Sequence, residues 1–148
     1  MITASYVALS MMLLALYGSF GRPIWYDESI YYVLGGFDSV ADVGHVIATT
    51  TTNVNQGVTG AHMLSVWVSL KVFGGSAFAL RLPSLIFAAY LMWASSVFLR
   101  ARRIGWLGQL ALPLILAGQT TLMYFAGEAR TYMPLSAATV GVLAYYAL

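Results

Sequence analysis

The sequence predicts an all-α integral membrane protein with about four transmembrane helices and one large outer loop that contains short interfacial helices. Of its 148 residues, 60% are hydrophobic and only 8% are charged, and the mean hydropathy is +0.79. Soluble domains carry roughly 25% charged residues, so this chain has too little polar surface to cover a globule in water. Residues 1–148 are therefore interpreted as a single membrane domain.

The formal charge of +2 is spread over loops, so no basic face is offered to nucleic acid. The chain has no cysteine, which excludes a disulfide framework, a thiol nucleophile and a cysteine-based zinc site.

Four predominantly apolar runs are long enough to cross a bilayer, at about residues 2–20, 80–99, 104–126 and 131–148. The first run lacks the basic start and small-residue exit of a signal peptide, so we expect it to be retained, with cleavage as the alternative. Pro83 is expected in the first turn of the second span, where a missing N–H costs little. Pro113 lies inside the third run and is tolerated if a neighbouring group bonds the freed carbonyl.

The outer loop, about residues 21–78, is expected to hold short helices. Asp27 is suited to cap a helix from Glu28 to Leu34 that two glycines would end. A second short helix is predicted to start at Ser39, because Asp42 follows at capping-box spacing. The polar threonine-rich tract at residues 49–57 is predicted to be a loop.

Residues 61–73 are predicted to form an amphipathic helix lying in the membrane interface. His62, Ser65 and Ser69 recur at spacings of three and four and form a narrow polar stripe on an otherwise apolar helix. Trp67 and Lys71 would anchor this helix at the membrane surface.

Three arginines crowd the short loop between the second and third runs: Arg100, Arg102 and Arg103. The positive-inside rule places this loop in the cytoplasm, although four dispersed basic residues then lie on or near the outer side. The large loop, the turn near residue 128 and all five acids consequently share the extracytoplasmic face.

Five residues on that face are candidates for chemistry: Asp27, Glu28, His62, Arg130 and Tyr132. Ionisable groups near membrane depth are costly and are therefore candidates for function. A carboxylate can act as general base toward a hydroxyl, and an arginine can hold a phosphate by a bidentate contact. A base and a phosphate ligand on one face suggest transfer from a lipid-linked phosphate donor.

Each candidate also has a structural alternative. Asp27 could simply cap a helix, and Glu28 could be a first-turn acid, a supporting partner or a metal ligand. Arg130 could reach toward lipid headgroups or pair with Glu128. His62 could be an ordinary interfacial residue, and Tyr132 could be an anchor at the membrane interface, where tyrosine is common. Adjacent carboxylates suit a divalent cation but do not require one, so cofactor use stays open.

The order of these features resembles the GT-C membrane glycosyltransferases of the protein O-mannosyltransferase and aminoarabinose transferase type, including the RgtA/B/C/D-like group. The resembling segments are Asp27-Glu28 with Tyr31-Tyr32 after a first span, the stretch Leu70–Ser84 with its Ala-Leu-Arg-Leu-Pro-Ser, and Glu128-Ala129-Arg130-Thr131-Tyr132. Because members of this family have many more spans, the chain is expected to correspond to their N-terminal part.

The resemblance implies roles for particular residues. Asp27 would be the catalytic base and Glu28 its partner, while Arg130, with Tyr132 nearby, would contact the phosphate of the donor. His62 falls where members often carry a histidine before two prolines in the acceptor region, but here Met63-Leu64 follow it.

The function expected from this resemblance is transfer of a sugar from a polyprenyl-phosphate donor to an acceptor hydroxyl of a lipid, glycan or protein. The protein would be a multi-pass component of the inner or plasma membrane, with its active face extracytoplasmic. The alternatives are an inactive truncated relic, a partner subunit that packs with another membrane chain, or a small transporter with the outer carboxylates as a cation relay.

Overall fold

The computed structural model describes residues 13, 22–53, 60–119, 124–129 and 132–148. In these ranges all regular secondary structure is helical. The helices are α2 (Tyr26–Leu34), α3 (Val40–Asn53), α4 (Gly60–Phe73), α5 (Ala77–Ala101), α6 (Trp106–Gly118) and α8 (Tyr132–Ala147). Apart from Leu13, the predicted first span at 2–20 lies outside the described residues.

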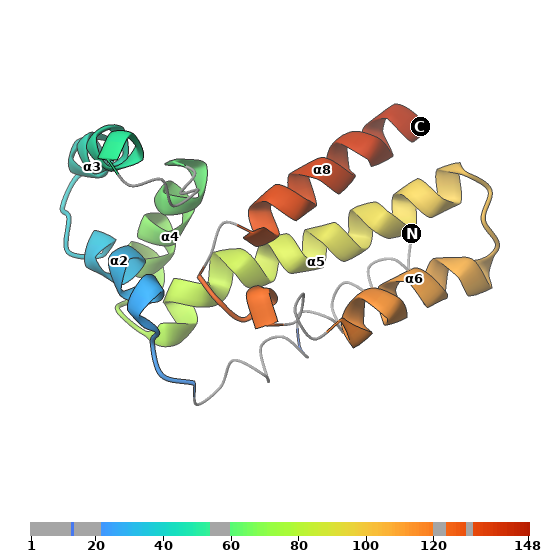
Figure 1. Ribbon diagram of the computed structural model, residues 1–148, viewed down its shortest axis with the longest axis horizontal. Helices are drawn as coiled ribbons and strands as arrows, with labels where there is room; N and C mark the ends of the chain where they lie inside the picture. Colours follow the sequence, from blue (N-terminus) through green and yellow to red (C-terminus); the bar gives the residue numbers. More distant parts are fainter. Residues whose placement is uncertain (1–12, 14–21, 54–59, 120–123, 130–131) are drawn as a thin grey trace.

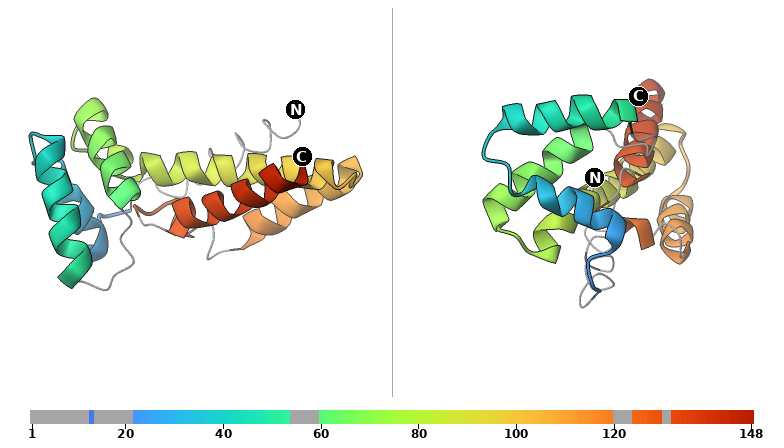
Figure 2. Two further views of the ribbon diagram at one scale, coloured as in Figure 1. Left: turned by 90° about the horizontal axis from the view of Figure 1, so that it is seen from above. Right: turned by 60° about the vertical axis from the view of Figure 1, so that its left-hand side comes forward.

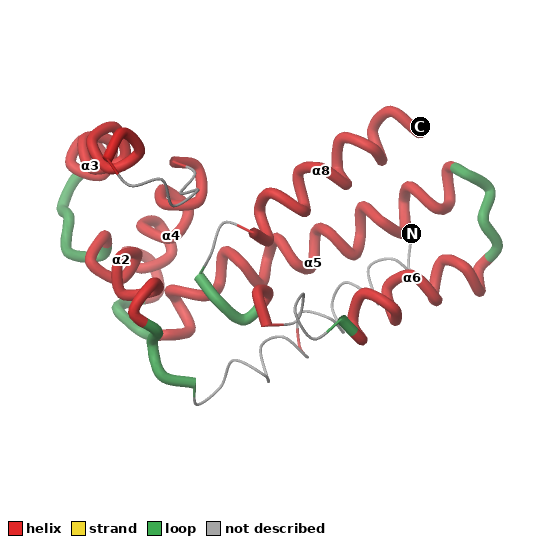
Figure 3. The backbone as a smooth tube through the Cα atoms, in the orientation of Figure 1, coloured by secondary structure: helices red, strands yellow, loops and turns green. Residues whose placement is uncertain are grey.

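The longest helix, α5, is the axis of the molecule (Figure 1). Helices α6 and α8 run alongside it, whereas α2, α3 and α4 gather at its N-terminal end, as the view from above in Figure 2 also shows. The tube in Figure 3 traces the loop that joins α5 to α6 at the opposite end. The fold therefore has an elongated part around α5 and a head formed by α2, α3 and α4.

Only α5, among the described helices, is long and apolar enough to cross a membrane. Its 25 residues extend about 37 Å, compared with a hydrocarbon core of about 30 Å. The predicted span at 80–99 is thus a long apolar helix. Over the predicted third and fourth spans, the described helices are shorter, with 13 residues in α6 and 16 in α8.

Pro83 does not lie in the first turn of its helix, as the sequence predicted. Helix α5 begins earlier, at Ala77, because the Ser76 hydroxyl caps it by accepting the N–H of Ala79. Pro83 thus lies inside the helix, and because proline has no N–H it cannot donate to the carbonyl of Ala79, four residues before it. The Ser69 hydroxyl of α4 donates to that carbonyl instead, at 2.6 Å, which satisfies the freed acceptor and joins α4 to α5.

Helix α8 packs closely along α5. Its inward face carries Ala137, Gly141 and Ala144, small residues spaced by four and three. A Cβ atom on Gly141 would lie 2.7 Å from the Tyr90 hydroxyl. A larger residue at position 141 would therefore require the Tyr90 side chain to move.

Large apolar side chains are exposed along α5, α6 and α8. They include Ile86, Tyr90, Trp106, Leu107, Ile115, Leu135, Val142, Leu143 and Tyr145. Exposed apolar side chains, where they join into a patch, mark surfaces that meet lipid or another protein.

The head corrects one of the local predictions and confirms another. Residues 49–53 are not a loop but the end of α3, where the Thr49 hydroxyl donates to the carbonyls of His45 and Val46 and so keeps its polar group inside the helix. The predicted start of a helix at Ser39 is confirmed: the Ser39 hydroxyl accepts the N–H of Asp42 at 3.2 Å and donates to the Asp42 carboxylate at 2.7 Å.

The polar stripe of α4 faces the protein. His62 and Ser69 are buried, whereas Leu64, Val68 and Val72 are exposed. Trp67, predicted to anchor in the interface, instead donates from Nε1 to the Phe37 carbonyl at 3.0 Å. Lys71 is partly exposed and lies 3.6 Å from Asp38. The buried face of α4 thus combines His62 and Ser69 with the apolar side chains of Met63, Val66 and Leu70, and further apolar side chains are exposed on the other side of the helix.

Candidate functional site

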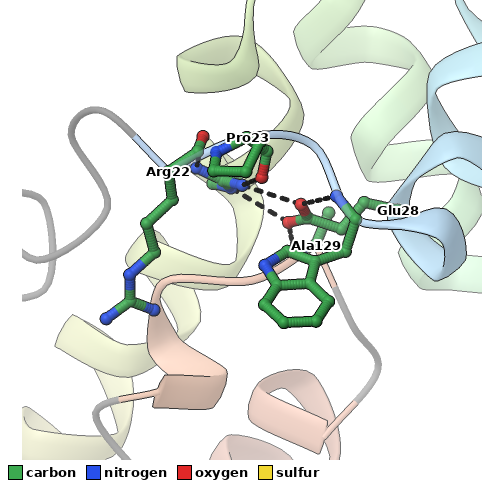
Figure 4. Close-up of polar contacts among 6 residues, drawn as sticks. Arg22, Pro23, Glu28 and Ala129 are labelled. Carbon is green, nitrogen blue, oxygen red and sulfur yellow. Dashed lines mark hydrogen bonds and ion pairs between the residues drawn. The ribbon is translucent and has the colours of Figure 1, made fainter.

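The centre of the candidate site is the carboxylate of Glu28, in the first turn of α2 (Figure 4). Its Oε1 accepts from Arg81 Nε at 2.9 Å and from the N–H of Ala129 at 2.9 Å. Its Oε2 accepts from Arg81 Nη2 at 2.7 Å and from the N–H of Trp25 at 3.1 Å. Four hydrogen bonds therefore satisfy one carboxylate, which is 0% exposed.

Arg81, near the start of α5, completes the cluster. Its guanidinium makes a bidentate pair with Glu28 and also donates to the carbonyls of Arg22, at 3.3 Å, and Pro23, at 2.9 Å. The side chain of Arg81 is only 2% exposed. We call Glu28, Arg81 and the N–H of Ala129 the clamp, because together they join α2, α5 and the turn that precedes α8.

The clamp also determines the ionisation of Glu28. Burial by itself raises the pKa of this carboxyl, but the hydrogen bonds from Arg81 and from the N–H groups of Ala129 and Trp25, together with the charge of Arg81, outweigh it. The pKa is consequently lower than its usual value of 4.5. Glu28 is an ionised acceptor at neutral pH.

The prediction that Asp27 caps α2 is wrong. The helix begins at Tyr26, and the capping residue is Trp25, whose N–H is bonded by Glu28 at the third helical position. Asp27 thus lies within the first helical turn and directly precedes the clamp residue Glu28.

Glu28 is a structural partner rather than an open ligand. All four of its hydrogen bonds come from protein donors, so binding of a metal would have to displace them. The described part of the chain contains no group of three or more histidine, cysteine or acidic residues that could hold a metal ion.

His62 is in the interior of the head. It is 1% exposed, and its ring meets the Tyr31 ring edge-on at a centroid distance of 5.2 Å. Within the described residues neither ring nitrogen has a hydrogen-bond partner. Burial lowers the pKa of His62 to about 4, with the nearby main chain of Ala129 opposing the shift, so the imidazole is neutral at pH 7.

The two remaining predicted residues come from the segment that follows the clamp. Arg130 lies outside the described residues, and it follows Ala129 in the chain. Tyr132 is the first residue of α8, is 48% exposed, and packs its ring against Phe125 with centroids 4.5 Å apart.

Arg81 is the residue of the site that the sequence-based reasoning did not identify. Its partner Glu28 lies 53 positions earlier in the chain, which no local pattern reveals. The available signal was its place in the Ala-Leu-Arg-Leu-Pro-Ser stretch, at the boundary of a long apolar run, where an unpaired charge would be costly.

No protein-family model matches the chain, and no curated protein or solved structure shows significant similarity to it.

Proposed function

We propose that this chain is part of a GT-C-type membrane glycosyltransferase that transfers a sugar from a polyprenyl-phosphate donor to an acceptor hydroxyl at the extracytoplasmic face. One observation carries the proposal. The three segments that resemble this family supply the three members of the clamp: Glu28 beside Asp27, Arg81 in the Ala-Leu-Arg-Leu-Pro-Ser stretch, and Ala129 beside Arg130. Segments separated by up to 101 positions thus contribute to one buried cluster.

In the proposed reaction Asp27 is the general base. Its carboxylate takes the proton of the acceptor hydroxyl while the hydroxyl oxygen attacks the anomeric carbon of the donor sugar. The bond between that carbon and the phosphate oxygen breaks, and the polyprenyl phosphate leaves with the bonding electrons. Arg130 compensates the charge of the leaving phosphate, and Tyr132 lies beside it in the chain.

Glu28 and Arg81 position these groups. Glu28 follows Asp27 in α2 and bonds the N–H of Ala129, which precedes Arg130. The clamp therefore joins the chain segment with the base to the segment with the phosphate ligand. Such pre-organisation is effective because small displacements of reacting groups cost large factors in rate.

A multi-pass arrangement of about four spans is part of the proposal. The length of α5 and the exposed apolar residues of α6 and α8 support it. Arg81 and Arg100 are separated along α5 by about 28 Å of helix, close to the hydrocarbon thickness of about 30 Å. The arginines at residues 100–103 would then face the cytoplasm.

The test compares Asp27→Asn with Asp38→Asn, a matched change of an acid whose side chain is 99% exposed. The protein is reconstituted in proteoliposomes with a panel of polyprenyl-phosphate sugars, and release of polyprenyl phosphate is measured. We expect Asp27→Asn to reduce release by about 10²-fold or more and Asp38→Asn to leave it unchanged. Equal rates for parent and Asp27→Asn would exclude Asp27 as the base, and no release from a folded protein that contains this chain together with the remaining spans of the enzyme would favour a partner subunit or relic.

A further inference from the structure

A groove of about 500 Å³ lies between α4 and the first part of α5. Its size is within the range of pockets that enclose small ligands. The walls are almost entirely apolar, with Leu64, Val68 and Phe73 from α4 and Leu82, Pro83 and Ile86 from α5.

Among the described residues that line this groove, the only hydroxyls are already engaged. Ser65 donates to the carbonyl of His62 at 2.7 Å, and Ser69 donates to the carbonyl of Ala79 at 2.6 Å. Neither hydroxyl proton is therefore available to a ligand. A hydrocarbon matches such walls, whereas a sugar, peptide or nucleotide would lose its hydrogen bonds to water without replacement.

The groove opens onto the apolar outer surface of α5. At its rim Val68 is 46% exposed and Ile86 is 53% exposed, and Tyr90, one turn further along α5, is also exposed. The groove is thus continuous with the surface of the helix that is long and apolar enough to cross a membrane. In a bilayer, hydrocarbon would reach it without crossing water.

The length of the groove indicates which hydrocarbon fits. Its α4 wall extends from Ala61 to Phe73, which is about 18 Å of helix. One leaflet contributes about half of the 30 Å hydrocarbon core, or roughly 15 Å. A chain that spans a single leaflet matches this length, and a much longer isoprenoid would leave most of its length outside.

We propose that the α4–α5 groove binds an acyl chain of a bilayer phospholipid, which packs between the two helices and completes the lipid-facing surface of the head. The proposal rests on the membrane location given under the proposed function. It adds a lipid site that is separate from the clamp, because Glu28, Arg81 and Ala129 are not among the residues that line the groove.

The test uses the whole chain in bilayers that contain a phosphatidylcholine with a photoreactive group in the middle of one acyl chain. After irradiation, adducts are mapped by mass spectrometry. We expect the adducts on residues 61–73 and 82–87. Val68→Trp fills the groove and should reduce the adduct yield by about tenfold, which corresponds to a modest change in affinity. Val142→Trp is the matched control, because Val142 is a similarly exposed valine on α8 away from the groove.

Each outcome decides between the proposal and its rivals. Equal adduct yields in Val68→Trp and Val142→Trp would overturn the acyl-chain proposal. Loss of the adducts on addition of equimolar polyprenyl phosphate would also overturn it, because that result would identify an isoprenoid site. Leu64→Trp is the second groove variant if Val68→Trp fails to fold. Carbonate extraction of the parent separately tests membrane integration, so failure of the membrane location and failure of the lipid site give different results.

Discussion

Breaking the buried Glu28–Arg81 pair is expected to destabilise the protein strongly. Arg81→Met removes the guanidinium and leaves an ionised carboxylate, 0% exposed, with only the N–H groups of Ala129 and Trp25. Removing one partner of a buried ion pair costs about 3–5 kcal/mol, because the remaining charge is uncompensated. Arg81→Met should therefore lower the free energy of unfolding by that amount.

Glu28→Leu should cost more than Arg81→Met. It leaves the guanidinium of Arg81 buried without its carboxylate partner, and it also removes the acceptor of the Ala129 N–H. An orphaned buried donor adds about 1–3 kcal/mol. In the double variant both charges are gone, so its loss should fall short of the sum of the two single losses by about 3 kcal/mol or more.

The assay is equilibrium unfolding in detergent, followed by tryptophan fluorescence. Lys71→Met is the control, because the Lys71–Asp38 pair has a 3.6 Å separation and side chains that are 36% and 99% exposed. An exposed pair contributes about 1 kcal/mol or less. If Arg81→Met costs no more than Lys71→Met, or if the two clamp substitutions add without coupling, the clamp does not stabilise the fold in the way described.

Two further predictions concern α4. Ser69→Ala should cost about 1–3 kcal/mol, because it orphans the carbonyl of Ala79. In a Pro83→Ala background an N–H at position 83 can bond that carbonyl, so Ser69→Ala should cost little there, and equal costs in both backgrounds would contradict the explanation. The parent should lose about 2 kcal/mol of stability between pH 7 and pH 5, because the pKa of His62 is about 4 when folded and 6.5 when unfolded. Between pH 7 and pH 5 the unfolded chain binds a proton at His62 that the folded chain does not bind, so the free energy of unfolding decreases as the pH is lowered. This decrease should be smaller in His62→Phe than in the parent. A parent with constant stability over the range would show that His62 is not buried and neutral.

Much of the local structure was predictable from the sequence. The capping pattern at Ser39 and Asp42 is confirmed, and the long apolar run at 80–99 is the one described helix that can span a membrane. These features depend on neighbours within a few residues. They are accessible to pattern analysis for that reason.

The predictions that failed depend on contacts made at longer range, or on competition between local signals. The threonines at residues 49–52 have low helix propensity, yet α3 continues through them. The polar stripe of α4 was recognised, but which side of the helix is buried depends on the elements that pack against it, and His62 and Ser69 are buried together with the apolar Met63, Val66 and Leu70.

The same reasoning changes the interpretation of Asp27. The strongest structural explanation for this acid was that it capped α2, but the helix starts before it, and Glu28 bonds the N–H of the true capping residue. Glu28 in turn is committed to Arg81 and Ala129, so it is not the freely available partner or metal ligand that adjacent acids suggest. Of the acidic pair, one residue therefore has a structural role that accounts for its burial and charge. Asp27 does not cap α2, so capping no longer explains its presence. This makes Asp27→Asn the most informative substitution in the chain.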